Sequence, residues 1–134
     1  MFHFGEKMDK NKAMQINPIV LAFVGDAVYS LFVRERLAFN LDYKTGELNK
    51  LATSEVKATA QAGFFKDIES LLTEEEMGIF KRARNAKKTT RAKNASITEY
   101  NISTGFEAVL GYLYVIGNYE RLNYILNKGV EDEN

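Results

Sequence analysis

Two long apolar stretches, each with one acidic residue near its middle, constrain the fold of this chain more than any other feature. In residues 18–33 the only charged residue is Asp26, and in residues 100–119 it is Glu107. On a helical wheel the large apolar side chains of the first stretch point in nearly every direction, which is typical of a helix packed on all sides. We therefore expect two core helices, each with its acid inside the core.

A carboxylate in a packed core must be paired with another group or bound to a cation. Gly25 directly precedes Asp26, and Gly111 follows Glu107 by four residues. Each glycine destabilises a helix by about 1 kcal/mol relative to alanine, but it lets two backbones approach closely. We expect the two helices to cross there, so that the carboxylates share a proton or a divalent cation. The alternative is that each acid is structural and is satisfied by an arginine, a tyrosine hydroxyl or a helix end.

The amino-acid composition limits the possible fold class and the possible kinds of functional site. A chain of 134 residues with one proline and 46% hydrophobic residues predicts a single all-α domain over residues 1–134. There is no cysteine, and the single histidine, His3, lies in an N-terminal segment, residues 1–15, that we expect to be loosely held. Disulfides, zinc sites and histidine-based catalytic triads are thereby excluded, and Mg²⁺ or Mn²⁺ is the metal to expect. We expect no signal peptide and no membrane span, and hence a cytoplasmic protein.

Caps and apolar periodicity predict helices at about residues 18–39, 45–65, 74–86, 97–116 and 119–128. Two of these helices open with a capping box, Thr73 with Glu76 and Ser96 with Glu99. We expect Gly63 to break or kink the second helix and Gly129 to end the last one. Residues 130–134 are then a disordered tail.

The positive charge of the chain is concentrated in residues 81–93, where seven of thirteen residues are basic and none is acidic. The net charge of the whole chain is zero, but a local positive field can still bind phosphates. We expect a projecting loop at residues 87–94, and the candidate nucleic-acid-binding residues are Arg82, Arg84, Lys87, Lys88, Arg91 and Lys93. Taken alone, such a run is more typical of a solvated loop, and it favours phosphate binding only in combination with the two acids.

The two acidic segments resemble those of a known family. LAFVGDAV at residues 21–28 resembles the signature segment of ribonuclease III endonuclease domains, and FEAVLGYLY from Phe106 resembles their second acidic helix. The single-domain length, the absence of a double-stranded-RNA-binding domain and RARNAK at residues 82–87 make the resemblance closest to the Mini-III branch. It covers about residues 15–128. It implies an all-helical homodimer that cleaves double-stranded RNA with Mg²⁺, leaves 5′-phosphate and 3′-hydroxyl ends, and matures 23S ribosomal RNA.

The same resemblance assigns roles to individual residues. It implies that Asp26 and Glu107 are the catalytic metal ligands and that Phe23 enters the partner protomer at the dimer interface. Larger members of the family carry further acids at the positions of Ala22 and Thr104, so only two carboxylates are expected here. Two other hypotheses remain: a catalytically inactive RNA-binding module associated with the ribosome, and a helical protein-interaction domain with structural acids.

Overall fold

The computed structural model describes residues 5–39, 44–88 and 95–132, and within these residues it is built from helices without a β-strand. The predicted all-α class is therefore confirmed. The elements are α1 (Lys10–Met14), α2 (Pro18–Phe39), α3 (Thr45–Val56), α4 (Ala58–Ile68), a short 3-10 helix η1 (Glu69–Leu71), α5 (Glu74–Asn85), α6 (Ile97–Val115) and α7 (Tyr119–Asp132). None of the described helices is long and apolar enough to span a bilayer.

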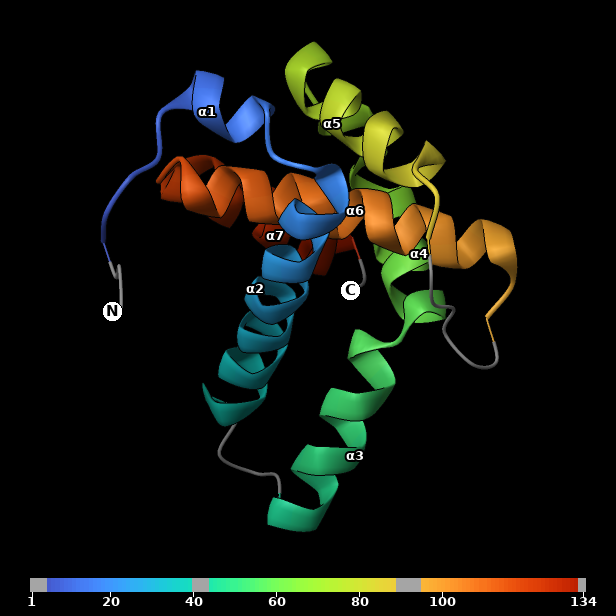
Figure 1. Cartoon of the computed structure of the whole chain (residues 1–134). Coiled ribbons are helices and arrows are strands. Elements are labelled where there is room, and N and C mark those ends of the chain that lie inside the picture. Colours follow the sequence, from blue (N-terminus) through green and yellow to red (C-terminus); the bar gives the residue numbers. More distant parts are fainter. Residues whose placement is uncertain (1–4, 40–43, 89–94, 133–134) are drawn as a thin grey trace.

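Helix α6 is the element around which the others pack. Figure 1 shows it lying across the middle of the molecule, with α2 running down from it and α5 above it. Phe106, Leu110 and Leu113 on α6 are buried, and α4 also packs against this helix. Both predicted capping boxes are present, at the starts of α5 and α6, and Gly117 follows the end of α6 with a φ of 75°. From these signals the sequence predicts bounds of α6 that are close to the observed ones.

Helix α2 has the predicted bounds but not the predicted surroundings. Leu21 and Val33 are buried, whereas Val20, Phe23 and Leu31 are 51%, 80% and 63% exposed. The prediction that α2 is packed on all sides is therefore wrong for the single chain, because none of the described helices covers this face. An apolar wheel does not distinguish a core surface from an apolar face left open to solvent.

The predicted second helix is two helices, and it divides at Lys57 rather than at Gly63. Lys57 has an extended backbone conformation between α3 and α4, whereas Gly63 lies inside α4 with open space around its Cα. Gly129 does not end α7, which continues to Asp132. A Cβ at Gly129 would overlap the ring of Phe64, so this glycine permits a close approach between α4 and α7.

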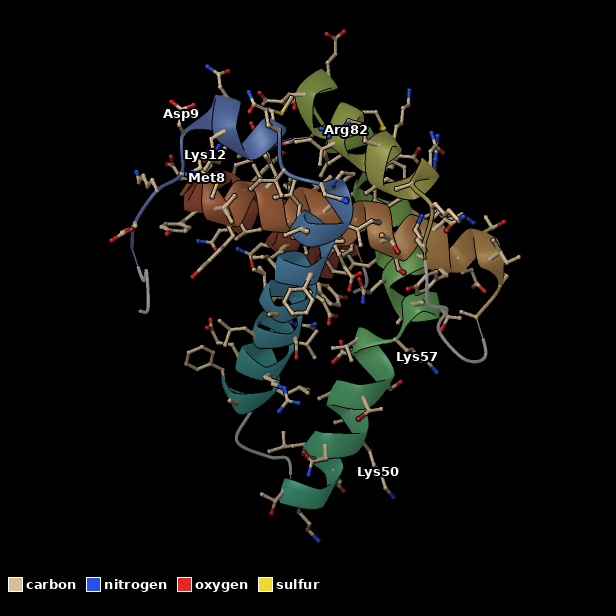
Figure 2. The ribbon with its side chains drawn as sticks, in the orientation of Figure 1. Met8, Asp9, Lys12, Lys50, Lys57 and Arg82 are labelled. Carbon is tan, nitrogen blue, oxygen red and sulfur yellow. The ribbon has the colours of Figure 1, made fainter. Side chains whose placement is uncertain are left out.

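Residues 5–15 and 130–132 are more ordered than the sequence predicts, whereas residues 1–4 and 133–134 lie outside the described residues. The segment that we expected to be loosely held contains α1, and Ala13 in this helix is completely buried. Just before α1, the Met8 N–H donates to the Val115 carbonyl at 2.7 Å. Arg82 on α5 donates to the Met14 carbonyl at 3.0 Å, and Figure 2 shows Arg82 on the side of α5 near α1. Residues 130–132 belong to α7, so they are not a disordered tail.

Candidate functional site

The crossing of α2 and α6 brings the two acidic segments together, as predicted. A Cβ at Gly25 would overlap the Glu107 carbonyl, and a Cβ at Gly111 would overlap the Leu21 carbonyl. The two backbones therefore touch, with a glycine from each helix at the contact. Gly25 precedes Asp26, and its contact with the Glu107 backbone fixes the two acids as neighbours.

The two neighbouring carboxyl groups have unequal access to solvent. Asp26 is exposed and Glu107 is partly buried. The prediction that both acids lie inside a packed core is wrong for Asp26, because its side of α2 faces an open pocket. The exposed carboxylate needs no structural counter-ion, and that weakens the reading of Asp26 as a purely structural acid.

The pocket beside this pair has a volume of about 460 Å³ and is formed by α2, α4, α6 and the end of α3. Ala22 and Thr104, the two positions where larger ribonucleases III carry further acids, also line it. The described residues that line it are Ile19, Ala22, Phe23, Asp26, Val56, Lys57, Ala58, Gln61, Tyr100, Ser103, Thr104 and Glu107. The Thr104 hydroxyl donates to the Tyr100 carbonyl at 2.9 Å. It is therefore directed to its own helix and not to the acids.

The electrostatics of the pair favour a bound positive charge. Burial, together with the hydrogen bond and the negative charge of Asp26, raises the pKa of Glu107 to about 9. A hydrogen bond from Gln61 opposes this shift. At neutral pH Glu107 therefore keeps a proton beside Asp26, and a divalent cation would take the place of that proton.

The donor set fits magnesium better than a metal that needs many protein ligands. Within residues 5–39, 44–88 and 95–132, no group of three or more histidines, cysteines and acids is placed to hold a metal ion. Two carboxylates remain, and Mg²⁺ is commonly bound by one or two carboxylates with water and phosphate oxygens as its other ligands. The open pocket leaves room for those ligands.

Two residues in the pocket were missed by sequence reasoning. Gln61 is 2% exposed and donates from Nε2 to Glu107 Oε2 at 3.3 Å. Lys57 is exposed, and among the described residues that line the pocket it is the only basic one. Figure 2 shows Lys57 at the junction of α3 and α4, whereas Lys50 lies on α3 itself. A glutamine in an alanine-rich helix and a lysine beside it carry no periodic signal that would single them out.

The four predicted RNA-binding residues that the structure describes, Arg82, Arg84, Lys87 and Lys88, are not among the residues that line this pocket, and several already have partners. Arg82 holds α1, as described above, and the Arg84 guanidinium donates to Asn85 and lies 5.4 Å from the centre of the Phe80 ring. Lys87 is exposed. Arg91 and Lys93 fall outside the described residues, so their assignment stays a prediction.

Lys88 has an additional structural role. Its ammonium donates to three carbonyl oxygens at the end of α5, those of Ala83 and Arg84 at 2.9 Å and that of Ala86 at 2.8 Å. Burial lowers the pKa of Lys88. A phosphate contact by this lysine would require the ammonium to leave the end of the helix.

Comparison with known proteins gives consistent matches over most of the chain. Residues 19–118 match the family model of the ribonuclease III domain. The Mini-ribonuclease 3 of Clostridium tetani is 46% identical over 126 residues, which cover 93% of this chain and 83% of the relative. The Mini-ribonuclease 3 of a Thermoanaerobacter species is 44% identical over 126 residues, which cover 94% and 89%. A crystal structure of a Fusobacterium nucleatum protein aligns with a TM-score of 0.77 at 32% identity, covering 90% of this chain and 96% of that one.

Proposed function

The chain belongs to the ribonuclease III family, in its Mini-ribonuclease III group, and from this membership we propose that it is a metal-dependent endoribonuclease that hydrolyses double-stranded RNA. One observation carries the proposal. The contact of α2 and α6 at Gly25 and Gly111 places Asp26 and Glu107 side by side in an open pocket. A paired, partly exposed set of carboxylates is the oxygen-ligand site that phosphodiester hydrolysis with Mg²⁺ requires.

Asp26 and Glu107 would hold Mg²⁺, and Mn²⁺ could replace it. When bound, such a cation lowers the pKa of a coordinated water and neutralises charge that develops on the phosphate. The two side chains would fix the position of the reacting phosphate relative to the water. Hydrolysis adds the water oxygen to phosphorus and breaks the bond to O3′, which takes up a proton. The products then end in a 5′-phosphate and a 3′-hydroxyl.

Positive charge near the pocket and at the end of α5 would bind the RNA backbone. Lys57 lies at the pocket beside the first residue of α4, where the helix dipole adds positive potential. Lys87, with the other basic residues of 81–93, would contact phosphates farther along the duplex. A-form RNA is recognised mostly through its shape and backbone, and such contacts suit that mode of binding.

We propose that the exposed apolar face of α2 is the interface of a homodimer. Val20, Phe23 and Leu31 leave large apolar surfaces in solvent, and Phe23 also lines the pocket. A two-fold axis beside Phe23 would bury this face against its copy and would place two acid pairs along one duplex. Each protomer could then cut one strand.

The biological role that fits this proposal is maturation of 23S ribosomal RNA in the cytoplasm. The competing function is a catalytically inactive RNA-binding module associated with the ribosome, and it is favoured by Ala22 and Thr104, which stand where larger relatives carry acids. Both functions require binding of double-stranded RNA. Only the first requires the two carboxylates to support cleavage.

Cleavage of a labelled duplex RNA by wild-type protein and by Asp26→Asn and Glu107→Gln tests the proposal. We expect Mg²⁺-dependent cleavage by the wild type and a loss of roughly a hundredfold or more in each variant, because each removes a charge from the cation site. Asp67→Asn and Glu120→Gln, which change exposed acids outside the pocket, serve as matched controls and should cleave normally. Near-normal turnover of either site variant would contradict the proposal. Duplex binding by a wild type that does not cleave in Mg²⁺ or Mn²⁺ would favour the inactive module.

A further inference from the structure

The carboxamide of Gln61 occupies a position that links three helices to the acid pair. Gln61 lies on α4, is 2% exposed and contributes to the pocket lining. Its Nε2 donates to the Val56 carbonyl at 2.6 Å and to Glu107 Oε2 at 3.3 Å. The Val56 carbonyl belongs to the last residue of α3, and Glu107 belongs to α6. One side chain thus connects the end of α3, the body of α4 and the acid of α6.

The two acceptors fix the orientation of the amide. The Val56 carbonyl oxygen can only accept, and this contact alone turns the nitrogen of Gln61 toward it. The second hydrogen of the same nitrogen then reaches Glu107 Oε2, which accepts it in the ionised, cation-binding form of the carboxyl group. Both hydrogens of Nε2 are then used. Rotating the amide by 180° would place Oε1 against the Val56 carbonyl, where two acceptors repel each other.

The opposite side of the same amide is left unsatisfied. Gln61 Oε1 is buried and has no hydrogen-bond partner among the described residues. Such a buried acceptor costs about 1–3 kcal/mol. An apolar side chain of similar size would avoid that cost, so packing and stability alone do not account for a glutamine here. Capping the end of α3 would use only one of the two hydrogens, and the other one reaches Glu107.

We propose that Gln61 is a positioning residue, which holds Glu107 Oε2 from inside the protein so that the other lone pairs of this carboxylate face the cation and Asp26. This inference rests on the proposed metal-dependent function. A carboxylate without such a partner can rotate about its last torsion, and a weakly bound cation then loses one of only two protein ligands. With two acids in place of the four of larger relatives, fixing each one matters more.

Binding of Mn²⁺ to the RNA-free protein, measured by the electron paramagnetic resonance signal of free Mn²⁺, tests this role without relying on activity. In Gln61→Met, which keeps the side-chain volume and removes the donor, we expect the dissociation constant to rise by roughly 10- to 100-fold. In cleavage assays kcat should fall at low Mg²⁺ and recover at high Mg²⁺, with an unchanged KM for RNA. Gln15→Met, at an exposed glutamine outside the pocket, is the matched control and should bind Mn²⁺ as the wild type does.

Three comparisons make the outcome decisive. A wild-type Mn²⁺ affinity in Gln61→Met overturns the inference, and so does a loss of activity that high Mg²⁺ does not restore. If Gln61→Met fails to fold, Gln61→Asn keeps a buried amide that is too short to reach Glu107, and it must show the same weakened Mn²⁺ binding. Asp26→Asn distinguishes a failure of the proposed cation site from a failure of the proposed role of Gln61. If Asp26→Asn binds Mn²⁺ as tightly as the wild type, the proposed cation site itself is wrong; if only Asp26→Asn weakens binding, the role of Gln61 alone is rejected.

Discussion

Three lysines that could each contact RNA differ in what already holds their ammonium groups. Lys57 and Lys87 are exposed, and Lys57 lies at the pocket of the acid pair. Lys88 is bound to three carbonyl oxygens at the end of α5. A lysine that is free to move can neutralise a phosphate at little cost, whereas a lysine that caps a helix must first give up its hydrogen bonds.

We expect Lys57→Gln and Lys87→Gln each to weaken binding of duplex RNA and to reduce the slope of log affinity against log salt by roughly one unit. The physical reason is that each variant loses one phosphate contact and the counterions released with it. Binding is measured at several salt concentrations with Ca²⁺ in place of Mg²⁺, so that the RNA stays intact. Lys50→Gln, an exposed lysine on α3 away from the pocket, is the control.

Lys88→Gln should behave differently from both. We expect it to lower the stability of the fold by about 1 kcal/mol, because the α5 carbonyls lose a charged donor. A change in salt slope without any loss of thermal stability in this variant would show that Lys88 is a phosphate contact after all. Unchanged slopes in the Lys57 and Lys87 variants would remove these residues from the RNA interface.

The helix crossing is the part of the site that could be predicted from sequence, because residues near each acid indicate it. A glycine beside each acid has no other use inside an apolar helix, so Gly25 and Gly111 together indicate a close contact of two backbones. The division of the chain at Lys57 could not be predicted, because its extended conformation is open to any residue and needs no glycine or proline. Gly129 was misread since a glycine near a helix end can serve as a stop or as a contact surface, and only the position of Phe64 decides between them.

The same limit explains why Gln61 was missed and why helical periodicity did not reveal the open face of α2, for which only the family resemblance implied an interface, at Phe23. A buried amide is identified by its partners, and those of Gln61 come from two other helices. An apolar surface on α2 is equally compatible with a buried core and with an interface between chains. The apolar pattern of a single sequence does not distinguish these two cases.

Replacing a glycine of the crossing should separate the two helices. We expect Gly25→Ala and Gly111→Ala each to destabilise the protein by about 3 kcal/mol or to prevent folding, because the new methyl group meets backbone atoms that cannot move aside. Gly78→Ala is the matched control. It lies inside α5 with open space around it, and its added methyl should stabilise the helix by up to about 1 kcal/mol. Urea unfolding followed by circular dichroism measures all three, and normal stability of Gly111→Ala would contradict the crossing.

The molecule as a whole is expected to act as a pair of chains. Phe23→Glu and Leu31→Glu place a charge on the open face of α2, and in sedimentation at micromolar concentration they should shift the protein from dimer to monomer. Ile97→Glu, at a 56% exposed apolar residue near the start of α6, is the control and should leave the dimer intact. A fully active wild-type monomer at this concentration would reject the dimer and, with it, the arrangement of two acid pairs along one duplex.

The proposed reaction depends on Asp26 and Glu107 together binding the divalent cation that cleavage requires. Anomalous scattering of Mn²⁺, in crystals soaked at a concentration that supports cleavage in solution, locates this cation. We expect a peak in the pocket, about 2.1 Å from an oxygen of each carboxylate, and no such peak in Asp26→Asn. A peak elsewhere in the protein, or a pocket that stays without Mn²⁺ at that concentration, would contradict this expectation.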